Sequence, residues 1–297
     1  MYDLKNNKNT YEKSINTHST TDPVKDDTCN NEEARTSKQI INVDTYLPKN
    51  PVKDWIPELQ LTMDDKKILE TSEWLNDAIV NAAQDLMRKE NTRYLGLQNV
   101  NLGLIKSFAP ISGEFVQILH TGCDHWNVIS TIGTTQSTVD VYDSIYCYSS
   151  IQTKSQIASI LHTKEKIMRI KYIDVMKQAG AADCGIFAIA FSTALINGYQ
   201  PGKYIFQQNL MRKHMLKCFE KRKITMFPIK RLRRTSYKLK RVENVVVYCT
   251  CRMPQEPGLN WIQCFACKEW FHTDTCVKVD KKYTQDRKLK WICSSCT

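Results

Sequence analysis

Eight cysteine and histidine residues near the C-terminus constrain the fold of this chain more than any other feature. Their spacing is C-x-C, twelve residues, C-x-x-C, four residues, H-x-x-x-C, sixteen residues, C-x-x-C. Eight such ligands suffice for two tetrahedral sites, and structural zinc is usually closed by four protein ligands. A segment of about fifty residues buries too little apolar surface to fold alone, so two structural Zn²⁺ ions are expected to supply much of its folding free energy. The expected ligands are Cys249, Cys251, Cys264, Cys267, His272, Cys276, Cys293 and Cys296.

The residues around these ligands resemble the plant-homeodomain (PHD) finger family. The phrase EWFH places Trp270 two residues before the ligand histidine, which separates this family from RING fingers, and the closing WICSSC resembles its last ligand pair. The resemblance implies one zinc site from Cys249, Cys251, His272 and Cys276, and a second from Cys264, Cys267, Cys293 and Cys296. Three residues, where the family usually has two, separate His272 from Cys276, and this extra residue is expected to bulge the loop or loosen the first site.

Three aromatic residues lie where family members that bind methylated lysine build an aromatic cage. They are Tyr248, Trp261 and Trp270. Aromatic faces attract a quaternary ammonium group. The alternative is that Trp270 belongs to the core of the module and the other two pack incidentally. Phe265 stands where some of these proteins carry an acidic residue, which argues against recognition of a neighbouring arginine.

A second group of residues, upstream of the zinc ligands, has the composition of a cysteine-protease site. Cys184 begins an apolar segment that predicts a helix, and a helix N-terminus favours the nucleophilic thiolate. His125 precedes a predicted strand and can act as base, while Asp143 ends the next strand, so a hairpin would let it orient the histidine. Gln178 can donate its amide N–H to an oxyanion beside the backbone N–H of Cys184. Taken singly, each residue has a structural alternative: a buried thiol, a packed histidine or a turn residue.

The sequence around these four residues resembles the ubiquitin-like-protein proteases, which include the SUMO proteases. The resemblance runs from Leu61 to Cys218 and includes EWLNDAIVN, HWNVIS, VYDS and Q-x5-CGIF. It implies a papain-like domain with a triad of His125, Asp143 and Cys184, Gln178 in the oxyanion hole, and no catalytic cofactor. Trp74 and Trp126 would cover a narrow tunnel for the Gly-Gly tail of SUMO, ubiquitin or NEDD8. Cys123, beside His125, is expected to be a structural or incidental cysteine.

Periodicity along the chain predicts an α+β fold. A helix is expected around Leu75 to Leu86 behind a cap at Ser72, then strands at 115–119, 126–132, 138–142 and 167–175, and helices at 184–197 and up to Glu220. We expect a disordered polar tail over 1–54, the protease domain over 55–222, a basic linker over 223–245 and the PHD module over 246–297.

The charge of the chain is concentrated in one segment. The formal net charge is +11, and residues 217–241 hold eleven Lys and Arg against Glu220 alone. Such a run is typical of a nuclear localisation signal or of non-specific contact with nucleic acid, and the alternative is a solvated linker. No secretory signal or membrane-spanning stretch is expected, so the cysteines favour metal binding or catalysis over disulfides, and the expected setting is intracellular and nuclear.

These observations lead to one functional hypothesis and three alternatives. The hypothesis is a nuclear deSUMOylase-like cysteine isopeptidase that a PHD finger brings to methylated histone tails. One alternative is a non-enzymatic chromatin reader whose protease domain is a scaffold. Another is a protease that processes a mobile-element protein, since the pairing also resembles uncharacterised invertebrate proteins of that kind. A third is a ubiquitin ligase, against which Trp270 argues.

Overall fold

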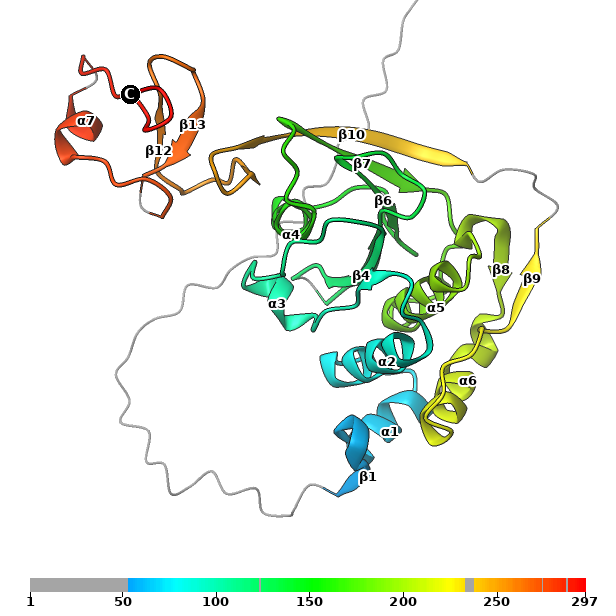
Figure 1. Cartoon of the computed structure of the whole chain (residues 1–297). Coiled ribbons are helices and arrows are strands. Elements are labelled where there is room, and N and C mark those ends of the chain that lie inside the picture. The colour runs from blue at the N-terminus through cyan, green and yellow to red at the C-terminus, as the bar shows by residue number, and fades with distance from the viewer. Residues whose placement is uncertain (1–52, 123, 233–237, 274, 287) are drawn as a thin grey trace, which may run out of the picture. The chain divides into compact units, whose positions relative to one another are not determined.

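The computed structural model describes residues 53–122, 124–232, 238–273, 275–286 and 288–297. The expected tail over 1–54, apart from its last two residues, and Cys123 lie outside the described residues. Mixed helices and strands make up the described part, so the prediction of an α+β fold is confirmed (Figure 1). No helix in that part is both long and apolar enough to cross a membrane.

The central feature of the described chain is one mixed sheet. Its strand order is β11-β10-β7-β6-β5-β4-β3. The pairs β3–β4 and β6–β7 are parallel, and the other neighbours are antiparallel. The strands are β3 (Leu95–Gly96), β4 (Phe115–His120), β5 (Trp126–Ser130), β6 (Thr138–Tyr142), β7 (Ile167–Ile173), β10 (Leu239–Tyr248) and β11 (Met253–Pro254).

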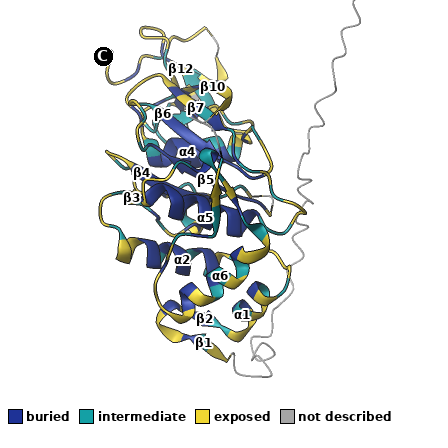
Figure 2. Ribbon diagram, turned by 90° about the vertical axis from the view of Figure 1, so that its right-hand side faces the viewer, coloured by how far each residue is buried: buried dark blue, intermediate teal, exposed yellow. Residues whose placement is uncertain are grey.

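Helices cover both faces of this sheet, because successive side chains of its inner strands point into two separate cores. Val116 and Ile118 of β4 pack with helices α1 (Met63–Glu70), α2 (Asp77–Glu90), α5 (Cys184–Ile196) and α6 (Gln208–Glu220). Phe115 and Leu119 of the same strand pack on the other side with helix α4 (Ile151–Leu161). Figure 2 shows the resulting buried layer between α4 and α5.

Helix α5 is the most deeply placed helix, since all thirteen of its residues are buried. A helix that is apolar all round is expected in a core. Its first residue is Cys184, so the fold fixes the position of that thiol through the packing of the whole helix. The helix and strand positions predicted around the site agree with the structure, including the whole of β6.

Helix α2 begins later than predicted. Its cap is Asn76, whose side chain accepts a hydrogen bond from the Ile79 amide, and not Ser72. The side-chain amide of Asn76 also donates to the carboxylate of Asp65. Asp65 and Thr62 together form the capping box of α1. The cap is therefore set by a contact between two helices, which local sequence does not reveal.

The described part of the segment 223–245, for which we predicted a basic linker, contains strand residues. Strand β9 (Ile229–Arg231) pairs with β8 (Tyr204–Phe206), and β10 pairs with β7 in the central sheet. Its Val245 and Val247 are buried, and these residues bind the strand to the sheet although its preceding residues are basic. Residues 233–237 lie outside the described part.

The remaining elements are short. They are β1 (Asp54–Ile56), the 3-10 helix η2 (Pro57–Leu59), β2 (Leu61–Thr62), α3 (Asn101–Leu104), the 3-10 helix η3 (Pro201–Lys203), β12 (Trp261–Gln263), β13 (Trp270–His272) and α7 (Lys281–Gln285). Strands β12 and β13 form the antiparallel hairpin of the C-terminal module.

Candidate active site and metal clusters

The hairpin of β5 and β6 brings His125 and Asp143 together. Val128 pairs with Tyr142, so the residues that flank the two strands meet at one end of the hairpin. His125 Nε2 lies 2.8 Å from Asp143 Oδ2, and both side chains are buried. Asp143 Oδ1 accepts hydrogen bonds from the backbone amides of Ile145 and Tyr146, each at 2.7 Å. Asp143 is therefore held on both oxygens, and it fixes the orientation of the imidazole.

Cys184 interacts with the same histidine. Its thiol is buried at the first residue of α5, with Sγ 3.9 Å from the carbonyl oxygen of Asp124, the residue before His125. Burial lowers the pKa of His125, but hydrogen bonds and charge interactions with Asp143 and Cys184 outweigh it and raise that pKa to about 9. At neutral pH the imidazolium is thus the favoured form of His125, and its positive charge lies beside the Cys184 side chain.

The loop before Cys184 is fixed by charged contacts from α6. Arg212 Nε donates to Asp183 Oδ1 at 2.8 Å, and Gln208 Nε2 donates to Asp183 Oδ2 at 2.6 Å. Arg212 also donates to the Ala182 and Glu73 carbonyl oxygens. One guanidinium therefore connects the loop before Cys184 with the segment that carries Trp74.

Gln178 lies beside the triad in this structure. Its Oε1 accepts a hydrogen bond from the Ser144 hydroxyl at 2.6 Å, and Ser144 follows Asp143. Its Nε2 donates to the Gly180 carbonyl oxygen at 2.9 Å. The amide donor of Gln178 would have to exchange that partner to serve a developing oxyanion.

The two predicted tunnel tryptophans are connected through Leu75. Trp126 is buried and its Nε1 donates to the Leu75 carbonyl oxygen at 3.1 Å, while Trp74 is half exposed. A Cβ atom added at Gly185 would lie only 2.9 Å from the Leu75 Cβ. The Trp74 segment therefore lies very close to the start of α5, which leaves a narrow approach to Cys184.

Sequence reasoning missed three residues that support this site. Lys177 Nζ donates to the carbonyl oxygens of Asp143, Ile145 and Tyr146 at 3.0, 2.8 and 3.3 Å. The ring of Tyr146 packs edge-on against His125. Arg212 binds Asp183 in the loop before Cys184. No local pattern in the sequence marks any of them, because each acts through a contact with a distant segment.

The eight C-terminal ligands form the two clusters that the resemblance implied. Cys249, Cys251, His272 and Cys276 make one, and Cys264, Cys267, Cys293 and Cys296 the other, with the ligand atoms of each within 4.8 Å of one another. Sulfur atoms on a tetrahedral zinc are roughly 3.8 Å apart, as follows from a Zn–S distance near 2.3 Å. The thiol and imidazole donor sets fit zinc.

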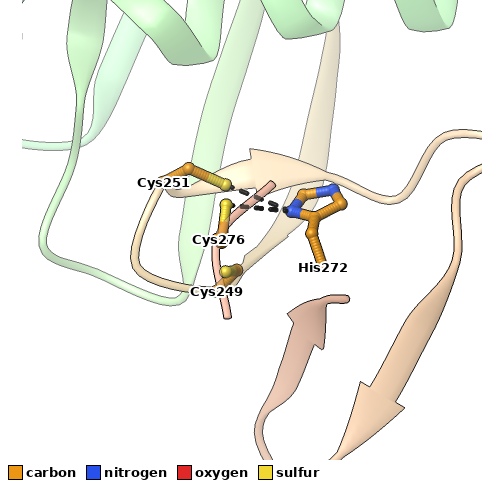
Figure 3. A group of neighbouring side chains, drawn as sticks. All are labelled: Cys249, Cys251, His272 and Cys276. Atoms are coloured by element: carbon orange, nitrogen blue, oxygen red, sulfur yellow. Dashed lines mark hydrogen bonds between the residues drawn. The ribbon is translucent and has the colours of Figure 1, made fainter. Parts of the chain in front are cut away.

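The extra residue between His272 and Cys276 does not remove Cys276 from the first cluster. Figure 3 shows Cys251 and Cys276 facing His272 Nδ1, at 3.4 and 3.7 Å from Sγ to nitrogen. The expected loosening is therefore not seen in the grouping of the ligands. Asp274 lies outside the described residues.

The aromatic residues of the module occupy two environments. Trp261 packs against the His272 ring at 3.7 Å between centroids and against Tyr248 at 5.9 Å. Trp270 is 39% exposed, while its neighbour Phe271 is the buried core residue and packs on Trp291. Trp261 pairs with His272 and Gln263 with Trp270, so both tryptophans lie on one face of the hairpin. They also line a common pocket of about 750 Å³.

Two family models match the chain in the regions of these sites. Residues 115–230 match the Ulp1 protease family, C-terminal catalytic domain, and residues 249–296 match the PHD-finger family. The chain carries a Ulp1-family cysteine protease domain and a PHD finger. The predicted family resemblance is thereby confirmed for both regions.

Comparison with single proteins gives shorter or more distant likenesses. Lysine-specific demethylase 7A of Xenopus tropicalis is 42% identical over 50 residues, which are 17% of this chain and 5% of that protein. Lysine-specific demethylase phf2 of Danio rerio is 42% identical over 52 residues, or 18% of this chain and 5% of that protein. The chain thus spans only a small part of these relatives.

Solved structures of SUMO proteases are also similar at low identity. The C-terminal Ulp1 protease domain in complex with Smt3, the yeast ortholog of SUMO, is 15% identical with a TM-score of 0.42, over 55% of this chain and 83% of that one. Ulp1 with its catalytic cysteine oxidised to a sulfinic acid is 13% identical with a TM-score of 0.44. The match covers 57% of this chain and 87% of that one.

The pKa of His125 gives a pH prediction for the Asp143→Asn variant. Because folding raises the pKa of His125 from 6.5 to about 9, protonated His125 increases the free energy of unfolding. This increase is fully present below pH 6.5 and is lost as the pH rises through about 9. In the variant the carboxylate that raises the pKa is gone. We expect the alkaline limb of kcat/KM to move to lower pH and turnover at pH 7 to fall by roughly 10²- to 10⁴-fold.

Asp140→Asn is the matched control for this variant. Asp140 is buried on the same strand, and burial raises the pKa of its carboxyl to about 6. Its substitution should leave the alkaline limb in place. An unshifted limb in Asp143→Asn, measured against this control, would contradict the assignment of Asp143 as the partner of His125.

Proposed function

We propose that this protein is a cysteine peptidase or isopeptidase that cleaves after the Gly-Gly end of SUMO or a related ubiquitin-like modifier. The observation that supports it most is the buried His125–Asp143 pair beside Cys184 at the start of α5, within a Ulp1-family domain. Ubiquitin and NEDD8 are the other candidate modifiers.

The reaction follows from the positions of these groups. The Cys184 thiolate attacks the carbonyl carbon of the last glycine, and the new C–S bond forms as the oxyanion accepts hydrogen bonds from the Cys184 amide and Gln178. His125 then gives its proton to the nitrogen of the leaving amine as the C–N bond breaks. His125 then takes a proton from a water molecule, which attacks the thioester carbonyl; the C–S bond breaks, the modifier leaves with a free carboxyl terminus, and the Cys184 thiolate is restored beside protonated His125. Trp74 and Trp126 admit only residues without side chains, which gives the Gly-Gly requirement its physical reason.

Turnover tests this function directly. SUMO, ubiquitin and NEDD8, each carrying a fluorogenic amide at the C-terminus, should be compared at equal concentration. We expect hydrolysis of at least one, with the other two slower. Absence of hydrolysis for all three, with protein shown to be folded and to contain zinc, would favour the non-enzymatic reader in which the protease domain is a scaffold.

We further propose that two Zn²⁺ ions occupy the C-terminal clusters and that the finger binds a methylated lysine of a histone tail. The pair Tyr248 and Trp261, with the exposed Trp270 on the same hairpin face as Trp261, supports an aromatic cage. Together with the protease domain, this would place the enzyme in the nucleus, close to modified chromatin proteins.

Trp270→Ala is the sharpest test of the cage. Trp270 is exposed, whereas Trp261 packs on the zinc ligand His272 and its loss could disturb the cluster. We expect binding to trimethyl-lysine histone peptides to weaken by roughly 2- to 30-fold, since a good cation–π contact contributes about 0.5–2 kcal/mol. Phe265→Ala is the control, because Phe265 is an exposed aromatic of the same module that already lies under Lys268 and Lys290. Equal affinities of Trp270→Ala and wild type on a peptide array would exclude this cage.

We also propose that the basic segment over 217–241 makes non-specific contact with nucleic acid. Arg222 lies 3.3 Å from Glu58, Lys240 lies 3.8 Å from Asp174, and Arg241 lies 3.8 Å from Glu243. These carboxylates compete with phosphate for the same cations. The remaining basic residues, some of them outside the described part, support the proposal through charge alone.

A further inference from the structure

A row of exposed apolar side chains begins at the catalytic histidine. Tyr146 packs edge-on against His125, with 5.0 Å between ring centroids, and Tyr148 packs against Tyr146 at 5.2 Å. Tyr146 is 39% exposed and Tyr148 is 46% exposed, and Ile145 and Ile151 beside them are also exposed. We call Tyr146 and Tyr148 the aromatic shelf. Adjacent exposed aromatic rings in contact with a catalytic residue are typical of a binding surface.

The backbone beneath this shelf is held in place. Asp143 Oδ1 accepts from the amides of Ile145 and Tyr146, and Lys177 Nζ donates to the carbonyl oxygens of Asp143, Ile145 and Tyr146. Helix α4 begins just beyond it with Ser150 as its cap. A ring held in advance loses little entropy when a ligand binds, so the shelf is suited to recognition.

The chemistry decides which part of the substrate lies on the shelf. His125 has to protonate the leaving nitrogen, so the leaving polypeptide lies on the histidine side of Cys184. The segment with Trp74 and Leu75 approaches the start of α5 at Gly185, and its Leu75 carbonyl oxygen accepts the hydrogen bond from Trp126 Nε1. Tyr146 is in ring contact with His125, and the shelf leads away from it.

We propose that Tyr146 and Tyr148 form a subsite for the leaving polypeptide, and that they select substrates with an aromatic or large aliphatic side chain within a few residues of the released nitrogen. This inference rests on the proposed peptidase function. It adds a second specificity element, since the Gly-Gly tunnel reads only the modifier. Aromatic pairs contribute enough for roughly a 2- to 10-fold preference per contact.

The test compares substrates that differ only in the leaving polypeptide. The modifier that the wild type accepts is joined to peptides with Phe, Leu or Ser next to the released nitrogen. One series uses a peptide bond and the other a lysine isopeptide bond, which shows whether precursors, conjugates or both use the subsite. We expect the wild type to have higher kcat/KM for Phe and Leu, Tyr148→Ser to lose this preference, and Tyr148→Phe to keep it.

Two controls separate this inference from the proposed function. Tyr199→Ser changes an equally exposed tyrosine that follows the far end of α5, and it should keep the preference. Capture by a modifier with a C-terminal electrophile involves no leaving polypeptide, so Tyr148→Ser should react at the wild-type rate. If Tyr148→Ser keeps the preference for Phe and Leu peptides, or if the wild type shows no such preference, the subsite proposal alone is overturned. Failure of the wild type to react with any electrophile overturns the peptidase function and the subsite with it.

Discussion

Cys184→Ala is expected to abolish hydrolysis of the modifier substrates. Removing a nucleophile that acts as a unit with its base typically lowers kcat by about 10⁴- to 10⁶-fold. The buried position at the start of α5 accepts alanine without strain, so the thermal unfolding temperature should stay close to that of the wild type. Steady-state hydrolysis and differential scanning calorimetry of the same preparation measure both.

The chain offers a matched control for this variant. Cys218 is also buried, it contacts His214 one helical turn before it, and that histidine lowers the pKa of its thiol against the effect of burial. This second Cys–His pair lacks the carboxylate and the helix N-terminus of the first, so Cys218→Ala should retain activity. Full activity in Cys184→Ala, or its loss in Cys218→Ala alone, would contradict the assignment of the nucleophile.

Loss of a cluster ligand is expected to unfold the C-terminal module. Cys264 is fully buried within its cluster, and metal binding contributes about 10–16 kcal/mol to the folding of zinc-finger peptides. In Cys264→Ser we expect native mass spectrometry to find fewer than two bound zinc ions. Hydrogen exchange should show loss of protection in β12 and β13.

Strand β10 should respond differently from the hairpin. It pairs with β7 from Leu239 to Val246, so its amides are expected to stay protected when the zinc module unfolds. Cys147→Ser serves as the control, because Cys147 lies outside both clusters. Two bound zinc ions in Cys264→Ser would contradict the cluster assignment.

The parts of this structure that local sequence could predict are those with a strong period or a fixed ligand spacing. Valine alternates with other residues along strand β6, and the residues of α5 are mostly apolar. The bounds of both elements were therefore predictable within one or two residues. The two Cys and His clusters were predictable, because a tetrahedral metal site demands a fixed number and spacing of ligands, and their pairing followed from family resemblance.

The parts that could not be predicted depend on contacts between distant segments. Serine and asparagine are both good N-cap residues, so the sequence alone does not decide between Ser72 and Asn76 as the cap of α2. The contact of Asn76 with Asp65 of helix α1 favours Asn76. Strand β10 leaves little local signal in the sequence, because the sheet edge that it pairs with is formed by β7, some seventy residues earlier. Lys177 supports the site by donating to backbone carbonyl oxygens, and Tyr146 supports it by packing on the His125 ring. Neither kind of contact leaves a pattern in the sequence.

Covalent capture tests the central claim most directly. The full chain should be incubated with SUMO, ubiquitin and NEDD8 that each carry a C-terminal electrophile, and its intact mass measured. We predict an increase by one modifier for at least one of the three, located at Cys184 by peptide mapping and absent in Cys184→Ala. No adduct with any modifier, from protein that is folded and contains zinc, would contradict the claim that this domain is a ubiquitin-like-modifier protease.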